Sequence, residues 1–162
     1  MVEDVDFLNP EIADKPDVRE RGARIELRPV ETADAAGASI YASQHVASGL
    51  GRCRLDFLES APYAADRMHW HPAMAGGEPE ERTFDRELSA DPLGWLRGRL
   101  ADGDRFLRDA GFADTGAYAA DVRAMAAAAD DIVAQVERVL ARARQPWPEV
   151  EGRDVRGMAA AV

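Results

Sequence analysis

The spacing of apolar residues changes once along the chain, near residue 90, and this change constrains the fold more than any other feature. Before it, apolar and polar residues alternate, as Leu55 and Phe57 do with Arg54 and Asp56, which is typical of a half-buried strand. After it, apolar residues recur at steps of three and four, which is typical of a helix with one apolar side. Because such a sheet and such helices bury their apolar sides against each other, the sequence predicts a two-layer α+β domain.

The predicted strands lie within residues 23–88 and form an antiparallel β-meander of four to five strands. The alternation is clearest at 52–59, and 66–72 shows it as well. Residues 73–81 contain Gly-Gly and Pro, which indicates a loop. The other candidate strands are 23–30, 38–46 and 82–88.

The predicted helices lie within residues 91–144 and form a C-terminal antiparallel hairpin packed on the sheet. Asp91 followed by Pro92 is typical of a helix start, because aspartate caps the first turn and proline fits its first position. The second helix should end near Arg144, because the prolines that follow cannot continue it.

Length and composition indicate one domain. The chain has 162 residues, of which 46% are hydrophobic, and this is enough to bury a core. We expect a single domain at 23–148, between an acidic flexible arm at 1–22 and a tail at 149–162.

The net charge of −10 disfavours nucleic acids and anionic membranes as partners, because both repel an acidic protein. No segment approaches the roughly 20 apolar residues of a membrane span and the N-terminus does not resemble a signal peptide, so we expect a cytoplasmic protein.

The stretch RMHWHP, residues 67–72, holds two of the three histidines. If 66–72 pairs with 52–59 so that both apolar sets point inward, the histidines face away from the core. This register puts Leu55 opposite Trp70 inside, and Asp56 opposite His69 and Arg54 opposite His71 outside. A similar pairing of 38–46 with 52–59 would add His45. The predicted polar face consists of His45, Arg52, Arg54, Asp56, Arg67, His69 and His71.

A metal ion is one interpretation of this polar face. On a strand, His69 and His71 point the same way, and Asp56 could supply an oxygen ligand or orient His69. Imidazole and carboxylate ligands suit zinc or iron. Arg54 counts against a metal, because a guanidinium beside a divalent cation is unfavourable.

A small anionic ligand, a carboxylate or a phosphate, is a second interpretation. Arginines beside histidines suit such a ligand, and bidentate pairing gives it a direction. His69, oriented by Asp56, would then be a general acid or base, so that these two become candidate catalytic residues. The candidate ligand-binding residues are Arg54, Arg52, Arg67 and His45.

Two further interpretations require no site on the sheet. The polar face could be solvated, with cross-strand ion pairs of small energetic value. The chain could also be a non-enzymatic interaction protein that assembles through its helical hairpin, with Ile132 and Val136 in the seam of a homodimer. Cys53, the single cysteine, falls on the inward side of its strand and is expected to be a core residue.

Overall fold

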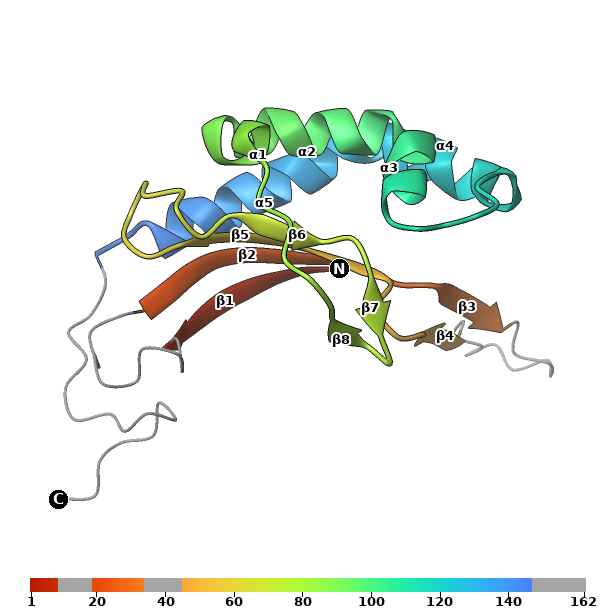
Figure 1. Cartoon of the computed structure of the whole chain (residues 1–162), viewed down its shortest axis with the longest axis horizontal. Coiled ribbons are helices and arrows are strands. Elements are labelled where there is room, and N and C mark those ends of the chain that lie inside the picture. Colours follow the sequence, from red (N-terminus) through yellow and green to blue (C-terminus); the bar gives the residue numbers. More distant parts are fainter. Residues whose placement is uncertain (9–18, 34–44, 147–162) are drawn as a thin grey trace, which may run out of the picture.

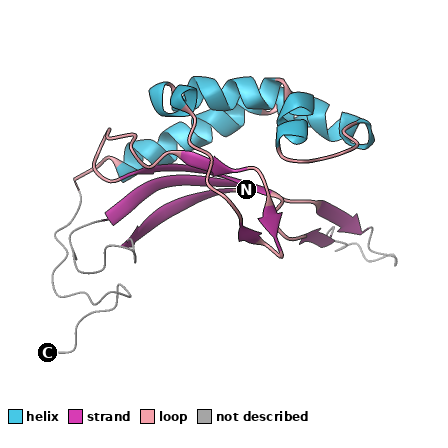
Figure 2. Ribbon diagram, in the orientation of Figure 1, coloured by secondary structure: helices cyan, strands magenta, loops and turns pink. Residues whose placement is uncertain are grey.

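The structure, a computed structural model, describes residues 1–8, 19–33 and 45–146 and has two layers (Figure 1). One layer is an antiparallel sheet, and the other is a group of helices that covers one face of it. Figure 2 shows the same separation, with helices above the sheet and strands below them. The predicted α+β class is confirmed. Within the described residues, no helix combines the length and apolar character needed to cross a bilayer.

The main sheet has four antiparallel strands in the order β1-β2-β5-β6. These strands are β1 (Val2–Leu8), β2 (Arg19–Leu27), β5 (Cys53–Glu59) and β6 (His69–His71). Two small sheets accompany it: β3 (Val30–Ala33) pairs with β4 (His45–Ser48), and β7 (Met74–Ala75) pairs with β8 (Glu78–Pro79).

The predicted helix start is confirmed, and both predicted helices are divided into shorter ones. Asp91 accepts a hydrogen bond from the backbone nitrogen of Gly94 and Pro92 occupies the first turn. Asp102 ends one helix and caps the next, because its side chain accepts a hydrogen bond from the Arg105 backbone nitrogen. The helices are α1 (Arg86–Ala90), α2 (Pro92–Ala101), α3 (Gly103–Asp109), the 3₁₀ helix η2 (Gly116–Tyr118), α4 (Ala119–Ala127) and α5 (Ala129–Ala143).

Helix α5 packs its apolar side on β1 and β2 and closes the core. Its buried residues are Ala129, Val133, Val136, Val139, Leu140 and Ala143. Most of them share one core with Ala23 of β2 and with Leu55 and Phe57 of β5. Of the two residues considered for a homodimer seam, Val136 has no exposed surface and Ile132 is partly buried against the same core.

The predicted register of 52–59 with 66–72 is confirmed over the length of β6. Trp70 lies opposite Leu55, and its ring lies 6.1 Å from that of Trp95, between the sheet and the helices. The histidines on either side of Trp70 therefore project to the other face of the sheet. The pairs are Arg54 with His71, Leu55 with Trp70, and Asp56 with His69.

The N-terminal residues and one strand pairing differ from the predictions. Residues 2–8, predicted as part of a flexible arm, form the edge strand β1. An edge strand needs little apolar surface, so this acidic segment lacks the apolar alternation from which a strand is predicted. Strand β5 pairs with β2 and not with 38–46, and β4, which begins at His45, pairs with β3. Strand β2 matches β5 over seven residue pairs. Residues 34–44 and the predicted tail lie outside the described part of the chain.

The prediction of a strand at 82–88 is wrong. Thr83 makes a single bridge with Trp70, and helix α1 begins three residues later. The cause is Asp85, whose side chain accepts a hydrogen bond from the Glu87 backbone nitrogen and so caps a helix instead of continuing a strand.

An ion pair ties the end of α5 to the end of β5. Glu59 has 1% of its surface exposed, and Arg144 donates to it through Nε at 3.1 Å and through Nη2 at 2.6 Å. The Tyr63 backbone nitrogen also donates to Glu59, at 2.9 Å. These hydrogen bonds raise the pKa of Arg144 and compensate a carboxylate that would otherwise be buried alone.

We predict that Arg144→Gln lowers the free energy of unfolding by about 2–3 kcal/mol, because it leaves Glu59 buried without its charged partner while solvent reaches part of the site. Urea denaturation provides the measurement. Arg142→Gln is the matched control: its pairing with Asp4 is exposed, and we expect a change below about 0.5 kcal/mol. Equal effects of the two substitutions would contradict this account.

Candidate metal centre

The candidate site consists of Asp56 on β5 and of His69 and His71 on β6. Side chains alternate along a strand, so Trp70 points to the helices and both histidines point to the opposite face. Asp56 lies directly across from His69 on that face. The three side chains thus meet on the side of the sheet that faces away from the helices.

These three residues are buried, although a solvated face was one of the expectations from the sequence. The exposed fractions are 1% for Asp56, 2% for His71 and 6% for His69. Part of the cover comes from the chain after β6, which turns back through β7 and β8 below the sheet (Figure 1). The Glu80 carbonyl at the end of this turn accepts a hydrogen bond from His71.

Backbone carbonyls fix the hydrogen positions of both imidazoles. Nδ1 of His69 lies 2.8 Å from the Arg67 carbonyl, and Nδ1 of His71 lies 2.8 Å from the Glu80 carbonyl. Because a carbonyl oxygen only accepts, each Nδ1 carries a hydrogen. In the neutral ring Nε2 then carries no hydrogen and has a lone pair. This tautomer can bind a metal through Nε2.

The two Nε2 atoms converge on one carboxylate oxygen. Oδ2 of Asp56 lies 3.4 Å from Nε2 of His69 and 3.6 Å from Nε2 of His71. The three candidate ligand atoms lie within 4.8 Å of one another. Nε2 of His69 is buried and has no hydrogen-bond partner among the described residues. An unpartnered buried lone pair beside a carboxylate is costly unless a cation lies between them.

Two arginines hold the carboxylate from its other sides. Arg24 donates from Nε to Oδ1 of Asp56 at 2.7 Å, and Arg54 donates from Nε to Oδ2 at 2.9 Å. Nη2 of Arg54 also lies 3.2 Å from Nε2 of His71, so it donates to that lone pair. Asp56 is therefore fixed in position by charge-assisted hydrogen bonds to both of its oxygens.

Burial keeps both histidines neutral near pH 7. Desolvation lowers the pKa of His69 and of His71, and it outweighs the opposing effects of the carbonyl hydrogen bonds and of Asp56. The positive charge of Arg54 lowers the pKa of His71 further, and Arg82 acts in the same direction on both rings.

The structure brings together four of the seven residues of the predicted polar face: Arg54, Asp56, His69 and His71. Arg67 is displaced to an ion pair with Glu20 at 3.7 Å, and Arg52 is exposed before β5. His45 belongs to a different sheet. Arg24 was missed, although it has the outward phase in 23–30, because its strand was not expected to lie next to β5.

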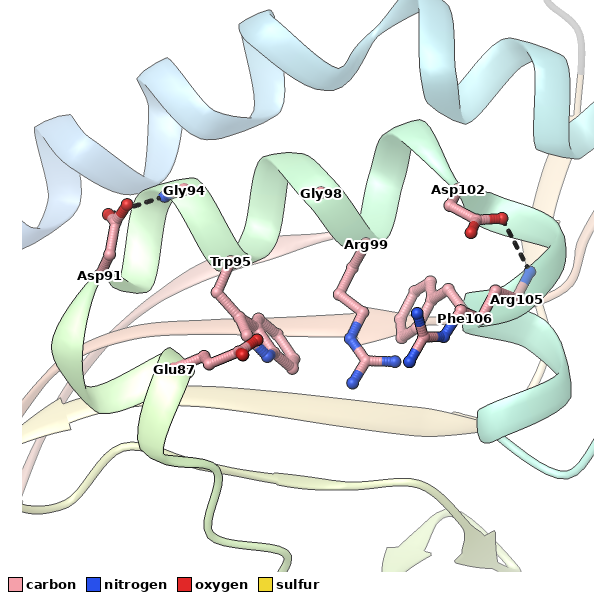
Figure 3. A pocket seen from close by; sticks show the side chains of 9 residues that line it. All are labelled: Glu87, Asp91, Gly94, Trp95, Gly98, Arg99, Asp102, Arg105 and Phe106. Atoms are coloured by element: carbon pink, nitrogen blue, oxygen red, sulfur yellow. Dashed lines mark hydrogen bonds between the residues drawn. The ribbon is translucent and has the colours of Figure 1, made fainter.

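Other hollows of the surface are less suited to a functional site. A hollow of 390 Å³ follows one side of α2, where Gly94 and Gly98 leave space between charged residues (Figure 3). Its two arginines, Arg99 and Arg105, are both paired with Asp109, and Arg99 also stacks on Trp95. Among the described residues that line this hollow, none holds a buried polar atom without a partner, as His69 does.

Comparison of the chain with protein-family models, with curated proteins and with solved structures finds no match. Interpretation of the centre therefore depends on its own geometry and charge.

Cys53 takes no part in this centre. It has no exposed surface and lies in the core on the helix side of β5, as predicted, and burial raises the pKa of its thiol to about 12. We predict that the native protein does not react with a thiol reagent such as DTNB at pH 8, and that one thiol reacts after unfolding in guanidinium chloride. Rapid reaction of the native protein would contradict the placement of Cys53.

The histidines should also make stability depend on pH when metal is absent. The unfolded chain binds protons near the ordinary histidine pKa of 6.5, whereas the folded chain resists them, so the free energy of unfolding should fall as pH drops from 6.5 to about 5. The slope is at most about 1.4 kcal/mol per pH unit for each histidine. Urea denaturation in EDTA measures it.

The double variant His69→Asn with His71→Asn is the control for this pH dependence, since an amide nitrogen can still donate to each carbonyl. We expect its stability to be nearly constant over the same interval. Carboxylates titrate mainly below it. An equal slope in both proteins would show that the histidines are not the cause.

Proposed function

We propose that the protein binds a divalent transition metal ion, zinc or iron(II), through Oδ2 of Asp56 and Nε2 of His69 and His71. The observation that carries this proposal is the buried Nε2 of His69, which has no hydrogen-bond partner among the described residues and lies 3.4 Å from Oδ2 of Asp56. A cation at this point would bind both groups.

The spacing of the ligand atoms fits an ion. Ligands at 2.0–2.1 Å from zinc in a tetrahedral site lie about 3.3 Å from one another. The two separations measured from Oδ2 of Asp56, 3.4 and 3.6 Å, are close to this value. The hydrogen bonds from Nδ1 to backbone carbonyls are those that usually orient metal-binding histidines.

A proton is the simplest competing cation, and the environment disfavours it. Burial lowers the pKa of both histidines, so at neutral pH neither ring supplies the missing hydrogen. A metal ion binds the neutral ring directly and forms two further bonds with the other ligands. A metal ion therefore provides a partner for both Nε2 lone pairs and for Oδ2 of Asp56 at neutral pH, which a proton does not.

Three protein ligands leave at least one coordination position open, which is typical of metal sites that bind a small molecule or activate water. In this proposal Asp56 is a metal ligand, which Arg24 and Arg54 hold in position through hydrogen bonds to its two oxygens. His69 likewise acts through its lone pair. The proposed activity is thus metal binding with access for one exogenous ligand.

We predict that untagged protein, stripped with a chelator, binds one equivalent of Zn²⁺, and that His69→Asn or His71→Asn weakens binding at least about a hundredfold. Isothermal titration calorimetry measures the affinity. A melting curve of each variant shows whether it remains folded.

His45→Asn is the matched control, because it removes the third histidine from a strand outside the site. We expect its zinc affinity to equal that of the wild-type protein. Wild-type protein that binds no zinc, or that binds it as tightly when both site histidines are replaced, would refute the proposed function.

A further inference from the structure

The charges around the centre do not balance once a divalent ion is added. Asp56 is the carboxylate at the centre, and both Arg24 and Arg54 donate to it. With neutral histidines this group carries a net charge of +1, which a divalent ion would raise to +3. The nearby carboxylates Glu26 and Glu20 already face Arg28 and Arg67.

Concentrating that much positive charge at a largely buried site is unfavourable, since solvent screens it only in part and the charges repel one another at short range. The described residues offer no further carboxylate with an oxygen on the metal position. A negative charge from outside the protein would therefore favour a bound metal.

Arg54 shows where that negative charge would lie. Its Nη2 lies 3.2 Å from Nε2 of His71, the lone pair that a metal would take. When the metal binds, this guanidinium loses its acceptor on His71 while remaining beside the open coordination position. An oxyanion bound to the metal through one oxygen could accept the freed hydrogen through another.

We infer that the centre binds its metal together with a small oxyanion, a carboxylate or a phosphate, which fills the open position of the metal and accepts a hydrogen bond from Arg54. This inference rests on the proposed metal site. It adds to the proposed metal site the chemical class of the exogenous ligand. It also makes metal binding and oxyanion binding cooperative, so that each should strengthen the other by the same factor.

Co²⁺ is a suitable probe, because its visible spectrum reports both affinity and coordination. Stripped protein is titrated with cobalt perchlorate in a buffer whose only other small anion is perchlorate, and then with acetate or with inorganic phosphate present. We expect either oxyanion to tighten cobalt binding by about 5- to 150-fold, the usual range for coupled ligands. The spectrum should change when the oxyanion joins the metal.

The variant Arg54→Gln tests whether Arg54 contacts the oxyanion or has only a structural role. It removes a positive charge from the metal's vicinity, so in perchlorate we expect cobalt to bind about fivefold more tightly or better than in the wild type. The enhancement by acetate and phosphate should disappear. Arg52→Gln, which removes the same charge two residues earlier, should behave like the wild type.

Calorimetry of phosphate binding tests the inference without any variant. Zinc-loaded protein should bind phosphate more tightly than metal-free protein, by the factor that phosphate adds to zinc affinity. Failure of the wild type to bind cobalt or zinc with or without oxyanions would refute the metal site itself. Metal binding of unchanged affinity and spectrum in all three buffers would leave the metal site intact and overturn the inference of an oxyanion.

Discussion

The register between β5 and β6 is the constraint on which both the core and the centre depend. Because successive side chains point to opposite faces, one register places Trp70 among the helices and both flanking histidines beside Asp56. A shift by one residue would bury the imidazoles in the apolar core and expose the indole. The apolar contacts of Leu55 and Trp70 therefore fix the position of the polar ligands behind them. The stability of the fold and the geometry of the site have a common origin.

Short-range patterns predicted this strand pair and the helix start at Asp91, because alternation and capping depend on residues close in sequence. The pairing of β2 with β5 was not predictable in the same way, since strand order depends on contacts between distant segments. For that reason Arg24 was missed and His45 was included. The burial of the polar face was also unexpected, because it depends on how the chain after β6 folds back beneath the sheet. The identities of the three candidate ligands followed from the alternation of side chains along the two predicted strands.

Electrostatics distinguishes this centre from a structural ion-pair network. Hydrogen bonds from Arg24 and Arg54 already provide partners for both oxygens of Asp56, so an ion-pair network would need no histidine. The Nε2 lone pair of His69 accepts no hydrogen bond and adds no stability to such a network. Buried polar groups without partners are rare in folded proteins, and each one calls for an explanation such as an absent ion. The same arginines that hold Asp56 in position repel a metal ion unless an anion accompanies it. In our proposal the cation and the anion are two parts of one charge balance, so that the metal and anion interpretations of the sequence describe one site.

The position of a bound metal tests the central claim most directly. Crystals of the protein soaked in zinc, with diffraction recorded on both sides of the zinc absorption edge, would locate the ion by its anomalous signal. The account predicts one strong peak on the face of the sheet opposite the helices, about 2.0–2.2 Å from Nε2 of His69, Nε2 of His71 and Oδ2 of Asp56. A well-occupied peak elsewhere, or none at this point while Arg54 still donates to His71, would contradict it.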